Sequence, residues 1–157
     1  MANMACANPE LPAGWTLPVP SDYTEFEQGY FKGKVPNKVH ADFNGDGIND
    51  SAWILINKSR TEWALFVSVS DPISNYKIIQ LDKGSFNSGV IFMGIGEAKL
   101  GKYATACGKG YWECGKGELP ELELPLPGID YYQFESASST FYWSKETNTF
   151  QRMWMSD

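Results

Sequence analysis

The chain has 157 residues, a length that suits one domain and is sufficient to bury a hydrophobic core. Apolar residues make up 43% and aromatic residues 15%, which excludes a disordered chain and favours the half-buried faces of β-sheets. The 13 basic and 19 acidic residues leave a net charge of −6, so we expect no nucleic-acid partner, and no apolar run is long enough for a membrane span.

The first predicted elements are an extended N-terminal arm and one short helix. Residues 1–20 contain four prolines and alternate small with apolar residues, which indicates an arm pinned to the domain by Trp15. The segment Ser21–Gly29 then offers an N-cap serine, acidic residues in the first turn and a terminating glycine, and so predicts a helix. Tyr23 and Phe26 are expected to face inward from it.

After the helix the apolar residues recur with a period of two, which predicts strands. Short, turn-rich connections between them favour antiparallel pairing. We therefore predict a mainly β fold: a single β-rich domain over residues 21–157, built as an antiparallel meander that forms a sandwich or a strongly curved sheet. The predicted strands are Val39–Phe43, Ser51–Asn57, Glu62–Ser68, Tyr76–Leu81, Gly89–Gly94, Ala98–Ala106, Tyr131–Glu135, Ser139–Ser144 and Thr149–Met155.

Residues 42–50 read Asp-Phe-Asn-Gly-Asp-Gly-Ile-Asn-Asp, a pattern typical of a calcium loop. Alternating oxygen-bearing side chains can all turn inward in a tightly wound loop, and Gly47 permits the sharp bend that follows. The alternative is a metal-free turn, because Asn-Gly and Asp-Gly are strong turn formers. The predicted calcium ligands are Asp42, Asn44 and Asp46 through their side chains, Ile48 through its carbonyl while its side chain packs, and Asp50 directly or through a water.

The motif Asp-x-Asn-x-Asp-Gly-x-x-Asp runs straight into the apolar stretch Ser51–Asn57 and is similar to the calcium loops of FG-GAP, or integrin-type, repeats. An EF-hand would require a flanking helix and usually an acidic residue at the twelfth position, which is Trp53 here. The resemblance covers Val39–Asn57 and implies a calcium ion in a β-hairpin loop, held by the same five residues. A single copy of the motif does not imply a propeller.

Cys107 and Cys114 bracket a short glycine-rich segment, which predicts a local disulfide and an oxidising compartment. A calcium loop of modest charge favours the same compartment, because such loops fill where calcium is abundant. We therefore expect a periplasmic or secreted protein whose signal peptide has been removed or replaced upstream. Cys6 is the odd thiol, which we expect to be free or variably paired.

The sequence offers no convincing catalytic constellation. His40 is the only histidine, so zinc, serine-triad and cysteine-nucleophile sites all lack partners, and we expect a strand histidine and no enzyme. A pair of carboxylates could still make a glycosidase. However, Glu118, Glu121 and Glu123 alternate with other residues, mostly leucine, as solvent-facing positions of an edge strand do.

The disulfide-closed segment is the remaining candidate for function. Its predicted partner-binding residues are Lys109, Tyr111, Trp112 and Glu113, which combine aromatic anchors with a polar rim. The alternative is that the two aromatic rings fold back and cap the sheet. We therefore hypothesise an extracytoplasmic, calcium-stabilised protein-binding module, of the inhibitor or immunity type, for a basic secreted or periplasmic effector enzyme. A calcium-dependent carbohydrate-binding module is the alternative, and a carboxylate hydrolase is a weaker third.

Overall fold

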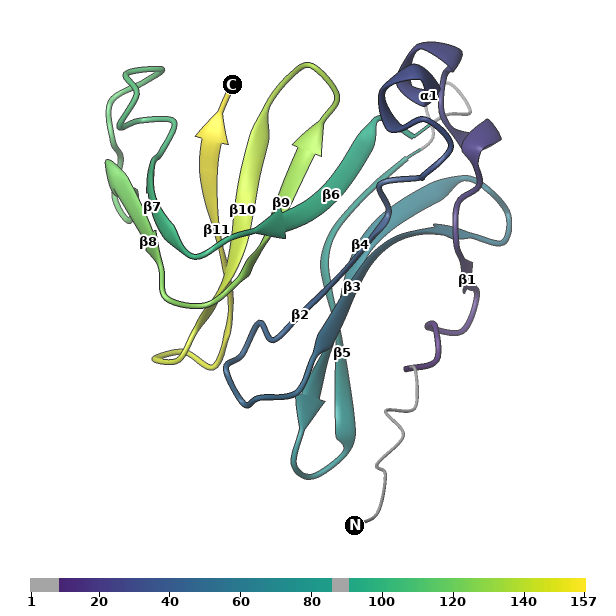
Figure 1. Ribbon diagram of the computed structural model, residues 1–157, viewed down its shortest axis with the longest axis horizontal. Helices are drawn as coiled ribbons and strands as arrows, with labels where there is room; N and C mark the ends of the chain where they lie inside the picture. Colours follow the sequence, from purple (N-terminus) through teal and green to yellow (C-terminus); the bar gives the residue numbers. More distant parts are fainter. Residues whose placement is uncertain (1–8, 86–90) are drawn as a thin grey trace.

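The computed structural model describes residues 9–85 and 91–157, so that Cys6 and the first two residues of the predicted strand Gly89–Gly94 lie outside the described part. The structure is mainly β, with 49% of residues in strands and 7% in helix, and the strands pair antiparallel (Figure 1). This confirms the predicted class, including the short N-terminal helix.

The first sheet has five strands. Its path runs β1-β3-β4-β5, and β2 also pairs with β3. The expected tight connection at residues 58–61 joins β3 to β4, and a second one joins β4 to β5. The strands are β1 (Trp15–Thr16), β2 (Lys38–Ala41), β3 (Asp50–Asn57), β4 (Glu62–Asp71) and β5 (Asn75–Ser85).

The second sheet has four strands in the order β11-β10-β9-β6, and a separate two-stranded ribbon, β7-β8, lies beside it. The predicted strand Ala98–Ala106 is wrong as a single element, because the chain turns at residues 99–100 and β7 pairs with β8 instead. The strands are β6 (Met93–Ala98), β7 (Gly101–Ala104), β8 (Glu121–Leu124), β9 (Gly128–Gln133), β10 (Ser138–Ser144) and β11 (Thr149–Ser156).

The main core lies between the two larger sheets, which makes the fold a sandwich. Ile54 from β3, Val67 from β4 and Ile129 from β9 are fully buried in it. Successive side chains of a strand point to opposite faces, so Trp53 and Leu55 lie on the other side of β3, where the N-terminal arm covers them. This explains why β3 reads as one uninterrupted apolar run.

Contacts at both edges tie the two sheets together. At one edge the Ile95 N–H of β6 donates a 2.9 Å hydrogen bond to the carbonyl of Pro36, just before β2. At the other edge Arg152 of β11 lies 3.4 Å from the Asp82 carboxylate of β5. The Arg152 guanidinium also stacks 4.2 Å from the centre of the Trp154 ring. These links fix how the two layers sit on each other.

The helix begins later than predicted. Helix α1 (Glu25–Phe31) starts after Thr24, whose side chain accepts the Glu27 N–H, while the Glu27 carboxylate accepts the Thr24 N–H. This reciprocal capping box outcompetes Ser21, which lies in the 3-10 turn η1 (Pro20–Asp22). Tyr23 is buried as expected, but Phe26 is 61% exposed, so its predicted inward position is wrong.

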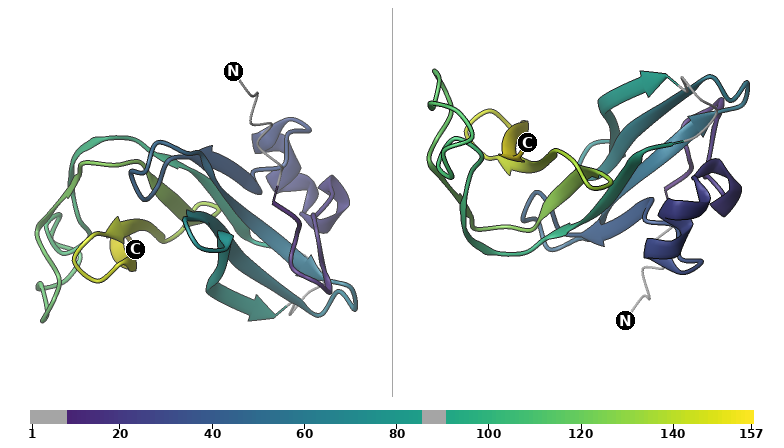
Figure 2. Two further views of the ribbon diagram at one scale, coloured as in Figure 1. Left: turned by 90° about the horizontal axis from the view of Figure 1, so that it is seen from below. Right: turned by 90° about the horizontal axis from the view of Figure 1, so that it is seen from above.

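Helix α1 and the β7-β8 ribbon lie at opposite ends of the molecule (Figures 1 and 2). The N-terminal arm follows the outer face of the first sheet, where Trp15 packs edge-on against Phe66 with ring centres 5.1 Å apart.

Within the part of the chain that the structure describes, no helix has the length and apolar character needed to cross a membrane.

Candidate functional site

The loop of residues 42–50 connects β2 to β3 and is wound around the Asp42 carboxylate. Its two oxygens accept the backbone N–H groups of Gly45 at 2.7 Å, of Asp46 at 3.1 Å and of Gly47 at 2.8 Å. Gly45 and Gly47 have positive φ angles of 78° and 86°, a conformation that glycine adopts without strain. The predicted sharp bend is therefore present, with two glycines instead of one.

Asn44 and Asp46 connect the loop to Ser70, which the sequence did not reveal as part of this site. The Asn44 amide donates to the Ser70 carbonyl at 3.2 Å, and the Ser70 hydroxyl donates to the Asp46 carboxylate. Partial burial raises the Asp46 pKa, but hydrogen bonds from Ser70, the Ile48 N–H and Asn44 outweigh it, so that this pKa lies below its usual value.

Asp50 occupies a different environment from the other loop carboxylates, because it is fully buried. One of its oxygens accepts the Phe43 N–H at 2.9 Å, and the other accepts the Ser70 N–H at 2.8 Å. Burial raises the pKa of Asp50, and these hydrogen bonds oppose that rise. Asp50 therefore closes the base of the loop and fastens it to β4.

The donor set of the loop suits a hard cation such as calcium. Asp42, Asn44, Asp46 and the Ile48 carbonyl would supply only oxygen ligands to such a cation, and Ser70 would add a hydroxyl. The Ile48 side chain is 45% exposed, contrary to the expectation that it packs. Among the described residues no three His, Cys, Asp or Glu side chains are grouped as a metal cluster, so a calcium ion here would depend on amide, hydroxyl and carbonyl oxygens as well as carboxylates.

A pocket of about 270 Å³ opens beside this loop. The residues that line it include Asn44, Asp46, Ser70, Lys77 and Trp143. The tip of the loop also approaches the β8–β9 connection, because a Cβ at Gly45 would lie 3.0 Å from the Leu126 side chain. The loop thus lies against the connection that precedes β9 as well as against β4.

The second candidate region is the segment between β7 and β8, residues 105–120. Cys107 and Cys114 form the predicted disulfide, with their Cα atoms 5.0 Å apart. Thr105 donates its hydroxyl proton to the Leu119 carbonyl and thereby closes the base of the segment. Gly108 lies so close to the Pro120 carbonyl that a Cβ there would be only 1.8 Å from its oxygen. The segment is therefore covalently and sterically constrained.

The two aromatic residues of this segment behave differently. Tyr111 is 55% exposed, as expected of a contact residue. Trp112 is half-buried, and its indole N–H donates to both oxygens of Glu118 at 3.1 and 3.2 Å. Glu118 also accepts the Gly115 N–H, so it is a positioning residue of the loop, and its predicted solvent-facing role is wrong. Trp112 therefore folds back onto its own segment while Tyr111 stays exposed, and the binding role of the pair stays a prediction.

Lys109 and Glu113, the other predicted contact residues, are both exposed. The Lys109 ammonium donates a 2.7 Å hydrogen bond to the Met155 carbonyl, which anchors the loop to the end of β11. The Ala106 N–H donates to the Trp154 carbonyl at 2.9 Å and extends that anchorage. Cys107–Cys114, Trp112–Glu118 and Lys109–Met155 together constrain the backbone of the segment that carries Tyr111.

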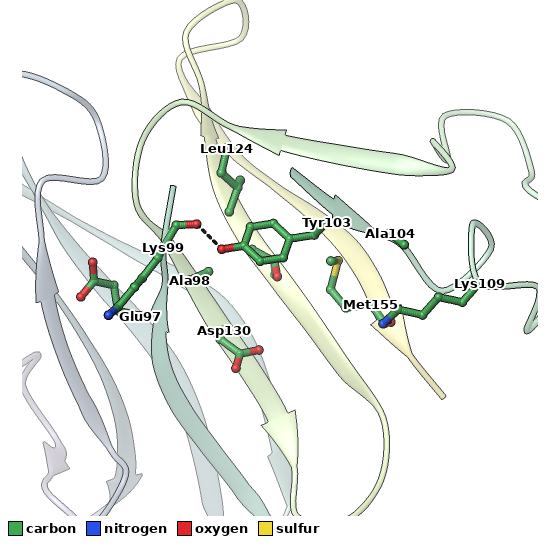
Figure 3. A pocket seen from close by; sticks show the side chains of 10 residues that line it. Glu97, Ala98, Lys99, Tyr103, Ala104, Lys109, Leu124, Asp130 and Met155 are labelled. Atoms are coloured by element: carbon green, nitrogen blue, oxygen red, sulfur yellow. Dashed lines mark hydrogen bonds between the residues drawn. The ribbon is translucent and has the colours of Figure 1, made fainter. Parts of the chain in front are cut away.

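A pocket of about 440 Å³ lies between the β7-β8 ribbon and the second sheet, next to this loop (Figure 3). It could not be predicted from the sequence, because its lining residues come from six strands, β6 to β11, that meet only in the folded chain. Tyr103 lines it with a ring whose hydroxyl donates to the Lys99 carbonyl at 2.7 Å. Its lining consists of Glu97, Ala98, Lys99, Tyr103, Ala104, Lys109, Leu124, Asp130, Thr140 and Met155.

His40 has the structural role that we expected. It lies opposite Ser51 in the β2–β3 pair, and its Nδ1 is 2.7 Å from the Ser51 hydroxyl. Partial burial and the nearby Lys38 lower the His40 pKa, against an opposing hydrogen bond with the backbone of Asp50.

Glu121 and Glu123 are exposed on β8 while the intervening leucines are buried, which confirms the predicted edge-strand alternation.

Comparison of the chain with protein-family models, with curated proteins and with solved structures gives no match. The FG-GAP resemblance therefore rests on the nine-residue motif and the strand that follows it.

Proposed function

We propose that the chain is an extracytoplasmic protein-binding module that calcium stabilises, and that it acts as an inhibitor or immunity-type protein for a secreted or periplasmic effector enzyme. The observation that carries this proposal is the exposed Tyr111 on a constrained loop. An aromatic side chain on a constrained backbone loses less conformational entropy on binding than one on a flexible loop, which favours it as an interface anchor.

The acidic surface supports a basic protein partner. The net charge of −6 would speed association with a positively charged effector and disfavour acidic competitors. The disulfide supports an oxidising compartment, because such bonds persist outside the reducing cytosol. Calcium at the 42–50 loop would be stabilising only, since its ligands are also engaged in holding the loop together.

The test is recovery of a protein partner from secreted or periplasmic extract of the organism that encodes the chain. We expect one stoichiometric partner, which is lost when Tyr111→Ala is used as bait. Tyr30→Ala is the matched control, because Tyr30 is 54% exposed but lies on α1 at the opposite end of the molecule. Equal recovery with Tyr111→Ala would contradict the proposed binding surface.

The alternative, a calcium-dependent carbohydrate-binding module, is favoured by one observation. The Tyr103 ring lines the 440 Å³ pocket, where a sugar face could stack on it. Retention on a polysaccharide column without a protein partner, abolished by Tyr103→Ala, would establish that alternative and overturn the inhibitor proposal.

A further inference from the structure

The pocket beneath the β7-β8 ribbon contains a carboxylate that has no partner. Asp130 lies on β9, between Ile129 and Tyr131, both of which are buried in the core between the sheets. Because side chains alternate along a strand, Asp130 faces the opposite way, toward the pocket that it lines. Its neighbour across the β6–β9 pair is Gly96, which has no side chain to cover it.

No residue in the described part of the chain donates a hydrogen bond or an ion pair to the Asp130 carboxylate. Asp130 is only partly exposed, and burial raises its pKa. Partly desolvated carboxylates normally gain a donor, since loss of hydration is costly. A positively charged ligand group would supply the hydrogen-bond donor that the Asp130 carboxylate lacks in the described part of the chain.

The rest of the pocket suits a long aliphatic stem that leads to this charge. Ala98, Leu124 and Met155 are apolar lining residues, and the Tyr103 ring stands above Asp130 (Figure 3). Lysine and arginine side chains have this composition: methylene groups that pack on apolar surface and a cationic end that seeks an anion or an aromatic face.

The lysines that line the pocket leave Asp130 unneutralised. The Lys109 ammonium is engaged with the Met155 carbonyl. The side chains of Lys99 and Glu97 extend together to one side, away from Asp130 (Figure 3). A cation that enters beside Asp130 therefore meets a carboxylate that no described donor engages.

We propose that this pocket takes up a lysine or arginine side chain of the protein partner, with Asp130 as the carboxylate that receives its cationic group. The inference rests on the proposed protein-binding function and deepens it. Lys109 belongs both to the pocket and to the disulfide-closed loop, so a partner that covers Tyr111 would lie next to the pocket opening. The acidic net charge of the chain favours a partner that carries such side chains on its surface.

The probe is Nα-acetyl-L-arginine methylamide, added to the isotopically labelled full chain while backbone amide shifts are followed by NMR. Nα-acetyl-L-lysine methylamide is the second cation, and the citrulline compound is the neutral isostere of the first. We expect saturable shifts at Gly96, Asp130 and Thr140, with a Kd on the order of millimolar for a single side chain. Binding of the citrulline compound should be at least about tenfold weaker.

Asp130→Asn should weaken arginine binding by at least about tenfold, whereas Glu146→Gln, an exposed acid of the β10–β11 turn that does not line the pocket, should change it by less than about twofold. Equal binding of citrulline, unchanged binding by Asp130→Asn, or absence of saturable shifts would each overturn the proposal. Preferential saturation by a neutral oligosaccharide would overturn it in favour of a sugar site. The titration needs no partner, so its failure is distinct from a failure of the Tyr111→Ala recovery experiment.

Discussion

The loops at residues 42–50 and 105–120 are both constrained, but their side chains are directed differently. In the first loop the polar groups turn inward: Asp42 and Asp50 accept five backbone N–H groups between them. In the second loop the constraints come from a disulfide and two side-chain anchors, and they leave the Tyr111 ring exposed. The first arrangement favours a structural role and the second favours recognition.

The difference shows that a rich hydrogen-bond network is weak evidence for a binding site. Oxygen atoms that already accept the amides of their own loop stabilise that loop, and any cation they hold adds to the same stability. An exposed aromatic ring on a constrained backbone has no such internal use. Changes in the first loop should therefore alter stability, and changes in the second should alter binding.

The largest expected effect on stability is that of Asp50→Ala. It leaves the buried N–H groups of Phe43 and Ser70 without an acceptor, which should lower the free energy of unfolding by about 2–4 kcal/mol and Tm by about 6–12 °C. Thermal unfolding in chelator measures this without any calcium contribution. Asn49→Ala, at an exposed position of the same loop, should cost less than about 0.5 kcal/mol. If Asp50→Ala lowered the free energy of unfolding no more than Asn49→Ala does, the 42–50 loop would not have the structural role that distinguishes it from the 105–120 loop.

Removal of the disulfide tests the second loop. The double variant Cys107→Ser, Cys114→Ser should lose about 2 kcal/mol of stability, or about 4–8 °C in Tm, because the cross-link closes only a short segment. Partner affinity should fall as well, since the backbone that carries Tyr111 would no longer be constrained by the cross-link. Stability lost with affinity unchanged would show that the cross-link has no role in recognition.

Calcium should stabilise the parent chain by mass action. At 10 mM calcium and a Kd on the order of 10⁻⁴ to 10⁻³ M, the gain over chelator is about 1.4–2.7 kcal/mol, or about 3–8 °C in Tm. Asp46→Ala should abolish this response, and Asn49→Ala should retain it. A parent chain whose Tm is the same in calcium and in chelator would identify the loop as a metal-free turn.

The smallest expected effect is that of Asp130→Asn on stability. Burial raises the Asp130 pKa in the folded chain, so folding favours the protonated carboxyl. The resulting stabilisation is fully present below the unfolded pKa and is lost as the pH rises through the folded pKa. At pH 7 the variant should therefore match the parent or exceed its Tm by up to about 3 °C, and this gap should close as the pH is lowered. A lower Tm at pH 7 would indicate a structural role for Asp130.

The β class and the tight hairpins could be predicted because they depend on local patterns. The alternation in β8 and the connection at residues 145–148 are examples that the structure confirms. The helix start was missed because two capping signals compete within four residues, and the reciprocal pair Thr24 and Glu27 outcompetes Ser21. The predicted strand 98–106 failed because its break depends on pairing with β8, which lies 17 or more residues further along the chain.

The candidate sites, like the fold, combine features that depend on sequence neighbours with features that depend on distant residues. The side chains of Asp42, Asn44 and Asp46 lie together because they are neighbours in sequence, whereas Ser70 joins them only through the β3–β4 pair. Asp130 is an ordinary polar position of a strand in the sequence. Its isolation depends on Gly96 across the sheet and on a distant ribbon above it, so no local pattern could identify it.

The most direct test of the account is the affinity of the recovered partner for Tyr111→Ala, measured by calorimetry beside the parent and Tyr30→Ala. Hot-spot aromatic residues contribute about 2 kcal/mol or more, so we predict a Kd at least about 30-fold weaker for Tyr111→Ala, with Tm within about 1 °C of the parent and no change for Tyr30→Ala. Affinity within about twofold of the parent would contradict the assignment of recognition to the disulfide-closed loop.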